Sequence, residues 1–200
     1  MAQYYGYVSV PHGSYQQWRD ATLGNGYDVD GWYGDQCWDF CALLYRQYGL
    51  TLITKAGGGG AVDCWRVSRY TNSQPPFESF TGVQNIKRGD ILVFDATPYN
   101  SAGHICFADA DYNDSYIDAN GIRRLSCLGQ NQRGNGSGYP ATVDDLNLSS
   151  FLGIFRNTEW GGGSPSPTPE SGYNKNRYNF VLFNRRNRQE KWTKKLLKRR

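Results

Sequence analysis

The stretch DQCWDFCALLYRQYG, residues 35–49, carries the strongest secondary-structure signal in the chain. Its apolar residues recur with helical spacing at i, i+3, i+4, i+7 and i+11, and these positions are Cys37, Phe40, Cys41, Leu44 and Tyr48. An aspartate at the start suits a helix N-cap, and Gly49 suits a helix end. We therefore predict a helix over residues 36–48 with Asp35 as its N-cap.

Cys37 falls at the second position of this predicted helix. Unpaired backbone N–H groups and the positive end of the macrodipole favour a thiolate there, which makes Cys37 a candidate nucleophile. The alternative is that Cys37 is a small core residue on the apolar stripe, as buried free cysteines commonly are. Position alone favours this second interpretation.

A nucleophilic thiol needs a base, and the chain offers two histidines, His12 and His104. His12 lies in the loop PHGS with no neighbouring carboxylate to orient it. His104 begins the β-rich segment GHICFAD, in which alternation places Cys106 on the same face and Ile105 on the other. His104 is therefore the candidate base.

The segment SYIDAN, residues 115–120, can return against GHICFAD through the turn DYN. That register sets Asn120 opposite His104 and Asp118 diagonal to it. Either residue would then accept the Nδ1 proton of His104 and leave Nε2 to take the proton from Cys37. The alternative is that Asp118 and Asn120 only end a strand, because both are common turn residues.

Acidic residues precede Cys37 with the spacing of a calcium loop. Positions 1, 3, 5, 7 and 12 of that loop are Asp28, Asp30, Trp32, Gly34 and Asp39. The three carboxylates, with the main-chain carbonyls of Trp32 and Gly34, would bind Ca²⁺ and clamp the loop before Cys37, so the metal would be structural. Alternatively the acids are solvated or complement the helix dipole.

Charge divides the chain into three parts. Residues 1–160 have a balance of −5 and are long enough for one domain with a core. Residues 161–172, GGGSPSPTPESG, have the composition of a linker, and residues 173–200 form a basic tail with a balance of +10. No apolar run predicts a membrane span or a secretory signal. The five cysteines, an odd number, predict neither a disulfide framework nor a zinc site.

Helical signals come first along the chain and strand signals afterwards. Further helices are predicted at residues 14–22, with Ser14 and Gln17 in capping-box spacing, and at residues 62–70. The later segments DILVFD, GHICFADA, SYIDAN and FLGIFR are short and β-rich. This order predicts an α+β fold with an antiparallel sheet.

Residues 25–157 resemble the CHAP domains, the cysteine, histidine-dependent amidohydrolases/peptidases, especially those of phage endolysins. The likeness is carried by DVDGWYGDQCWDF, RGDILVF, GHICFAD and IDANG in the family's order. It implies a papain-like α+β fold with N-terminal helices packed on an antiparallel sheet, and calcium at Asp28, Asp30 and Asp39.

The resemblance also implies roles at the site. Cys37 would attack an amide, His104 would be the general base, and Asp118 would orient it. Gln36 and Asn120 match the polar wall of the site, where they would assist at the oxyanion. Asp118 stands where these lysins often carry Glu, so Asn120 is a second candidate orienter. Gly34 replaces a side-chain metal ligand of some relatives.

The expected function is hydrolysis of bacterial peptidoglycan at the stem peptide, the cross-bridge or the muramyl-L-alanine link. The alternatives are a non-enzymatic virion or wall-adhesion protein and an intracellular papain-like cysteine peptidase. We expect a phage-encoded monomer that is made in the host cytoplasm without a signal peptide and acts on the cell wall at lysis, or that is carried in the virion. Its basic tail would bind anionic wall polymers or membrane rather than nucleic acid.

Overall fold

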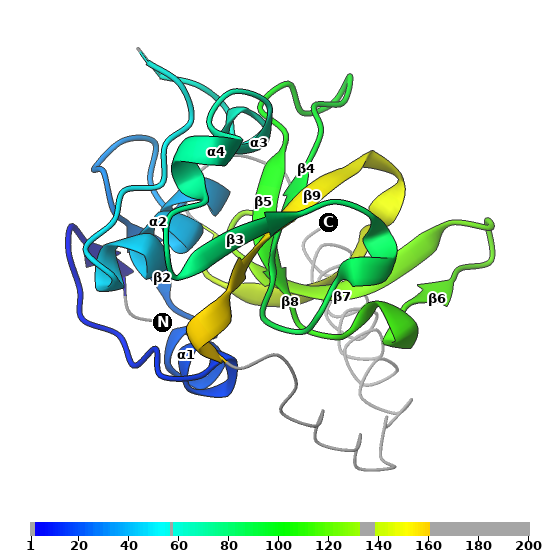
Figure 1. Ribbon diagram of the computed structural model, residues 1–200, viewed down its shortest axis with the longest axis horizontal. Helices are drawn as coiled ribbons and strands as arrows, with labels where there is room; N and C mark the ends of the chain where they lie inside the picture. The colour runs from blue at the N-terminus through cyan, green and yellow to red at the C-terminus, as the bar shows by residue number, and fades with distance from the viewer. Residues whose placement is uncertain (1–2, 57, 133–138, 161–200) are drawn as a thin grey trace, which may run out of the picture. The chain divides into compact units, whose positions relative to one another are not determined.

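The computed structural model describes residues 3–56, 58–132 and 139–160. The predicted linker and basic tail lie outside these residues. The helices are α1 (Tyr15–Thr22), α2 (Cys37–Gln47), α3 (Asp63–Arg66) and α4 (Arg69–Asn72). In Figure 1 they gather at one side of a sheet built from the later part of the chain. Within the described residues, none of the helices is long and apolar enough to cross a membrane.

The main sheet has the strand order β3-β9-β4-β5-β7-β6, with β8 also paired to β7, and its pairings are all antiparallel. Its strands are β3 (Phe77–Phe80), β4 (Ile91–Phe94), β5 (His104–Ala108), β6 (Tyr116–Ile117), β7 (Arg123–Gly129), β8 (Thr142–Asn147) and β9 (Phe151–Asn157). A separate parallel pair joins β1 (Gln3–Tyr5) to β2 (Gly26–Asp28). The predicted α+β, papain-like fold class is confirmed.

Helix α2 packs against the sheet along the predicted apolar face. Phe40, Cys41 and Leu44 are fully buried, and the rings of Phe40 and Phe107 on β5 lie 5.3 Å apart in an edge-to-face arrangement. The helix is followed by Gly49 with a φ of +69°, a conformation that glycine adopts without strain. The contact between Phe40 and Phe107 holds the first turn of α2 beside β5.

The ends of the predicted helices needed correction. The N-cap of α2 is Gln36 rather than Asp35, so the helix begins at Cys37. At α1 the Ser14 hydroxyl accepts from the backbone N–H of Gln17, as the capping signal predicted. The helix predicted over residues 62–70 is instead two short helices, α3 and α4.

The predicted pairing of residues 115–120 with β5 is wrong. Strand β5 pairs with β4 on one side and with β7 on the other, while β6 pairs with β7. The segment RRLSCLG, which forms β7, takes the place beside β5 that the sequence argument gave to SYIDAN. Figure 1 accordingly shows β6 at the edge of the sheet away from α2.

Candidate active site

The thiol of Cys37 lies at the beginning of β5. Cys37 is the first residue of α2, and the backbone N–H groups of Ile105 and Trp38 lie close enough to its sulfur to lower its pKa. Ile105 directly follows His104, so the structure brings the predicted nucleophile to the main chain beside the predicted base. Among the described residues, no hydrogen bond joins the Cys37 thiol to the imidazole itself.

The surroundings of Cys37 keep its thiol protonated. Desolvation raises the pKa of Cys37 to about 11, and the backbone hydrogen bonds from Ile105 and Trp38 oppose this shift without overcoming it. The sequence argument expected the helix dipole to favour the thiolate. Enclosure by the protein outweighs the dipole here, although the residue as a whole keeps part of its surface exposed.

His104 is the first residue of β5 and lies across from Phe94 on β4, with 6.2 Å between the two rings. Its Nε2 atom is buried and has no hydrogen-bond partner among the described residues. Burial lowers the pKa of His104 to about 4, and an interaction with the Gln132 side chain partly offsets this. Nε2, the nitrogen predicted to take the proton from Cys37, is therefore enclosed by the protein without a partner among the described residues.

Asp118 and Asn120 do not lie beside His104 in the sheet. They belong to the turn between β6 and β7, where the Asp118 carboxylate accepts from the backbone of Asn120 and Ile122. Asp118 also pairs with Arg124 Nε at 2.6 Å, and this contact lowers the pKa of the Asp118 carboxyl. Asp118 thus stabilises the turn between β6 and β7, and Asn120 in the same turn is exposed.

The Gln36 side chain lies in the loop that leads into α2. Its Nε2 donates to the Tyr33 carbonyl at 2.8 Å, and its Oε1 accepts from Asn131 Nδ2 at 3.3 Å. One hydrogen of the Gln36 amide is left for another acceptor. The predicted place of Gln36 next to Cys37 is thus compatible with the polar wall that the resemblance implies.

Three polar residues that were not predicted as part of the site follow β7. Gln130 is fully buried and donates to the carbonyls of Tyr27 and Gln36, while its Oε1 accepts from Tyr27 N–H. Asn131 reaches Gln36, and Gln132 interacts with His104. The signal was the alternation of Leu125, Cys127 and Gly129, which marks a strand ending at this polar run.

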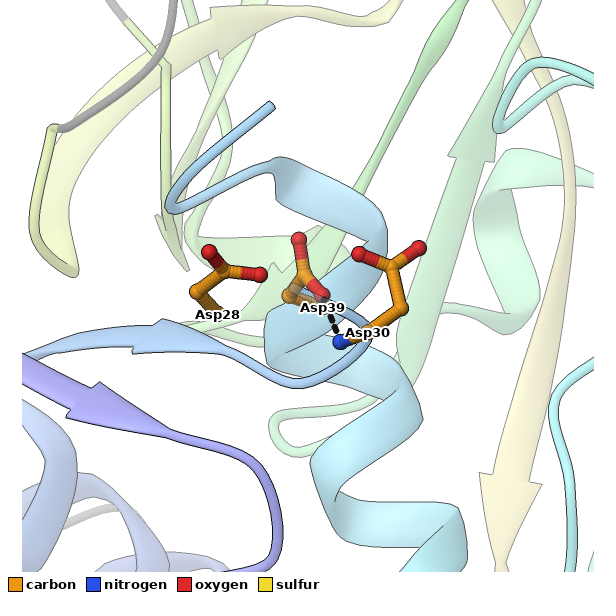
Figure 2. Close-up of side chains that lie close together, drawn as sticks. All are labelled: Asp28, Asp30 and Asp39. Carbon is orange, nitrogen blue, oxygen red and sulfur yellow. Dashed lines mark hydrogen bonds between the residues drawn. The ribbon is translucent and has the colours of Figure 1, made fainter. Parts of the chain in front are cut away.

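Asp28, Asp30 and Asp39 form a compact acidic cluster, in which one carboxylate oxygen of each residue lies within 4.8 Å of those of the other two. Figure 2 shows the three side chains side by side, and a hydrogen bond from the backbone N–H of Asp30 to Asp39. Asp28 and Asp39 are buried, whereas Asp30 is exposed. The spacing argument therefore predicted three groups that the structure brings together.

The acidic cluster has the chemistry of a cation site. Its carboxylates form no ion pair with a lysine or arginine among the described residues, and burial together with the charge of Asp30 raises the pKa of Asp39 to about 7. Uncompensated buried carboxylates are unfavourable, and a hard cation would neutralise them. The donor set fits Ca²⁺, which prefers oxygen ligands.

The loop between these acids curls tightly. Gly31, Tyr33 and Gly34 have φ values of +78°, +65° and +70°, and a positive φ is costly for a residue such as tyrosine. Trp32 lies at the exposed part of the loop, and Gly34 leads into Asp35. The two predicted carbonyl ligands thus belong to a segment with the tight curvature that a calcium loop requires.

Together the fold and these residues define a papain-like α+β domain with a cysteine at a helix start and a histidine at a strand start. No protein-family model matches the chain. The chain is 32% identical over 130 residues to a D-alanyl-L-alanine endopeptidase of Streptococcus phage B30, a match that covers 63% of this chain. The chain spans 26% of that relative's length.

A solved structure gives the second comparison. The wild-type endolysin LysIME-EF1 matches with a TM-score of 0.53 and 25% sequence identity, over 74% of this chain and 64% of the other. The similarity to phage endolysins that the sequence predicted is confirmed by these matches.

Proposed function

We propose that the chain is a peptidoglycan hydrolase that cleaves an amide bond by cysteine nucleophilic catalysis. The observation that carries the proposal is that Cys37, at the start of α2, lies near the backbone N–H of Ile105, the residue next to His104. The similarity to an endopeptidase and an endolysin supports hydrolysis over a purely adhesive role. It also supports a phage-encoded protein acting on the wall over an intracellular peptidase.

The chemistry follows from the two side chains. The Cys37 sulfur adds to the amide carbonyl while His104 Nδ1 takes the thiol proton, and His104 then protonates the leaving amine. Water attacks the resulting thioester and releases the acid. With a pKa of about 4, the imidazole is neutral at pH 7 and able to accept the proton. Backbone N–H groups at the start of α2 and the Gln36 amide would stabilise the oxyanion.

The test is hydrolysis of purified Gram-positive walls by the wild type, by Cys37→Ala and by Cys127→Ala as a matched buried-thiol control. We expect Cys37→Ala to lose clearance and Cys127→Ala to keep it. Mass spectrometry of the fragments identifies the bond, and the relative's name makes the D-alanyl-L-alanine linkage the first candidate. Clearance by Cys37→Ala at the wild-type rate would refute the proposal.

We further propose that the acidic cluster binds Ca²⁺ through Asp28, Asp30 and Asp39, with the main-chain carbonyls of Trp32 and Gly34. The converging carboxylates and the absence of a paired cation among the described residues support this. A bound ion would neutralise the buried charge and hold the loop that precedes Cys37. It would take no part in bond cleavage.

The basic tail, residues 173–200, is proposed to hold the acidic domain on anionic wall polymers or membrane. Its balance of +10 against −5 for residues 1–160 supports this role. Deletion of residues 173–200 should weaken pelleting with walls, most clearly at low salt, because screening already weakens the attraction at high salt. Unchanged pelleting at low salt would exclude it.

A further inference from the structure

The amide of Gln132 is fixed in one orientation. Its Nε2 donates to the carbonyl of Cys127 at 3.0 Å and to that of Thr142 at 2.6 Å. Both amide hydrogens are thereby used, so the oxygen has to point away from these carbonyls. Gln132 Oε1 is buried and has no hydrogen-bond partner among the described residues. Because buried polar atoms are normally hydrogen-bonded, we expect a nearby donor for Gln132 Oε1.

The Gln132 side chain folds back over Gly129 at the end of β7. An ideal Cβ built on Gly129 would lie 2.8 Å from the Cβ of Cys106 and 3.2 Å from the Cδ of Gln132. The amide therefore occupies the space above Gly129, on the face of the sheet to which Cys106 points. His104 alternates with Cys106 on that face, so the lack of a side chain at Gly129 lets Gln132 reach toward the imidazole.

The group that Gln132 Oε1 lacks is present on His104. A neutral imidazole has one N–H donor and one acceptor, and His104 Nε2 is buried without a partner. Gln132 is the side chain that interacts with this imidazole, and no charged group contributes to the shift in the His104 pKa. The two atoms fall short of full hydrogen-bond geometry, as catalytic contacts often do before substrate binds.

We propose that Gln132 is the positioning residue of the site: it accepts a hydrogen bond from His104 Nε2 and so turns Nδ1 toward Cys37. The proposal rests on the proposed function, in which His104 is the general base. Gln132 takes the role that the sequence argument gave to Asp118 or Asn120. Asn131 is the competing candidate by sheet register, and its Oδ1 is also buried without a partner among the described residues. Gln132 is preferred because its amide lies over Gly129 beside the face of His104 and because Gln132, unlike Asn131, contributes to the His104 pKa.

The first test reads the histidine tautomers of the free wild-type protein by ¹⁵N NMR at pH 7. His12 Nδ1 lies 2.8 Å from the Val10 carbonyl, so His12 should carry its proton on Nδ1. His104 should carry its proton on Nε2, and His12→Gln assigns the signals because the chain has two histidines. An Nδ1–H tautomer at His104 would overturn the proposal without any variant at Gln132.

The second test compares Gln132→Met with Gln132→Glu. Both variants lose the two Nε2 donors, so any structural effect of that loss is common to them. The proposal expects opposite shifts: the pKa of His104 falls in Gln132→Met, which has no acceptor, and rises in Gln132→Glu, whose carboxylate favours the imidazolium. Shifts in the same direction, or none, would overturn it.

Kinetics separate positioning from binding. Gln132→Met should lower kcat on wall fragments by about tenfold or more with little change in KM, because the base is misoriented while the substrate contacts remain. Gln74→Ala, at an exposed glutamine, is the control and should behave as wild type. If walls are not cleaved but the NMR results hold, the proposed function fails and the placement of His104 stands. If walls are cleaved but the NMR shifts are absent, the proposed function stands and the positioning role of Gln132 fails.

Discussion

Asp39 Oδ2 accepts a hydrogen bond of 3.0 Å from the backbone N–H of Gln36, the N-cap of the helix that starts with Cys37. Asp39 Oδ1 accepts from the backbone N–H of Val29 at 2.8 Å. One carboxylate therefore belongs both to the acidic cluster and to the capping of α2. Any change in the charge or position of Asp39 is transmitted directly to the residue beside the thiol.

Calcium should raise the thermal stability of the protein, and EDTA should lower it, because an ion that binds only the folded state stabilises that state. Asp28→Asn should weaken Ca²⁺ binding by about tenfold or more, as loss of a charged ligand costs at least as much as loss of a supporting contact. Calorimetric titration measures the affinity, and Asp20→Asn, at an exposed aspartate outside the cluster, is the control. An identical melting temperature with calcium and with EDTA would contradict the proposal that the acidic cluster binds Ca²⁺.

Asp118→Asn should hydrolyse walls at a rate within about twofold of wild type, since Asp118 closes a turn on β6 and a surface ion pair contributes little to stability. The initial rate of turbidity loss is the measurement, with Arg124→Gln as the partner variant that breaks the same contact. A large drop in rate for Asp118→Asn alone would return the orienting role to this residue.

The stability of the protein should rise with pH between about 4 and 6.5 through His104. The folded-state pKa is lowered to about 4, so in this range the unfolded chain binds a proton that the folded protein excludes. The contribution of His104 to the free energy of unfolding therefore falls as the pH drops from 6.5 toward 4, while Asp39, whose pKa is raised to about 7, contributes in the opposite direction. Urea unfolding at pH 5 and pH 7 measures the difference, which should shrink in His104→Gln and persist in His12→Gln. Equal pH dependence in all three proteins would contradict the prediction.

Gln130→Ala should destabilise the domain by about 2 kcal/mol or more, because it leaves buried main-chain groups of Tyr27 and Gln36 without partners. Chemical denaturation measures the loss, and Gln74→Ala is again the exposed control. We also expect lower hydrolytic activity in the folded fraction, since the carbonyl of the helix N-cap is released. Unchanged stability would mean that water replaces the amide.

The parts of the site that sequence predicts well are local. The acidic cluster and the start of α2 come from one loop and one helix, where spacing determines which groups converge. The strand beside β5 was predicted wrongly because that pairing depends on contacts between segments far apart in the chain. SYIDAN alternates more clearly than RRLSCLG, whose arginines and serine obscure the buried Leu125 and Cys127. The sheet nevertheless pairs β5 with β7.

The hydrogen bonds of Gln130 span 103 residues to Tyr27 and 94 residues to Gln36. Cys37 and the three aspartates of the acidic cluster lie within the first forty residues. Gln130, whose amide binds the main chain of Tyr27 and Gln36, is synthesised much later. A nascent chain halted before β7 would hold every reactive group of the N-terminal half and still lack the assembled centre. During synthesis the complete site can therefore form only after the C-terminal strands have been made.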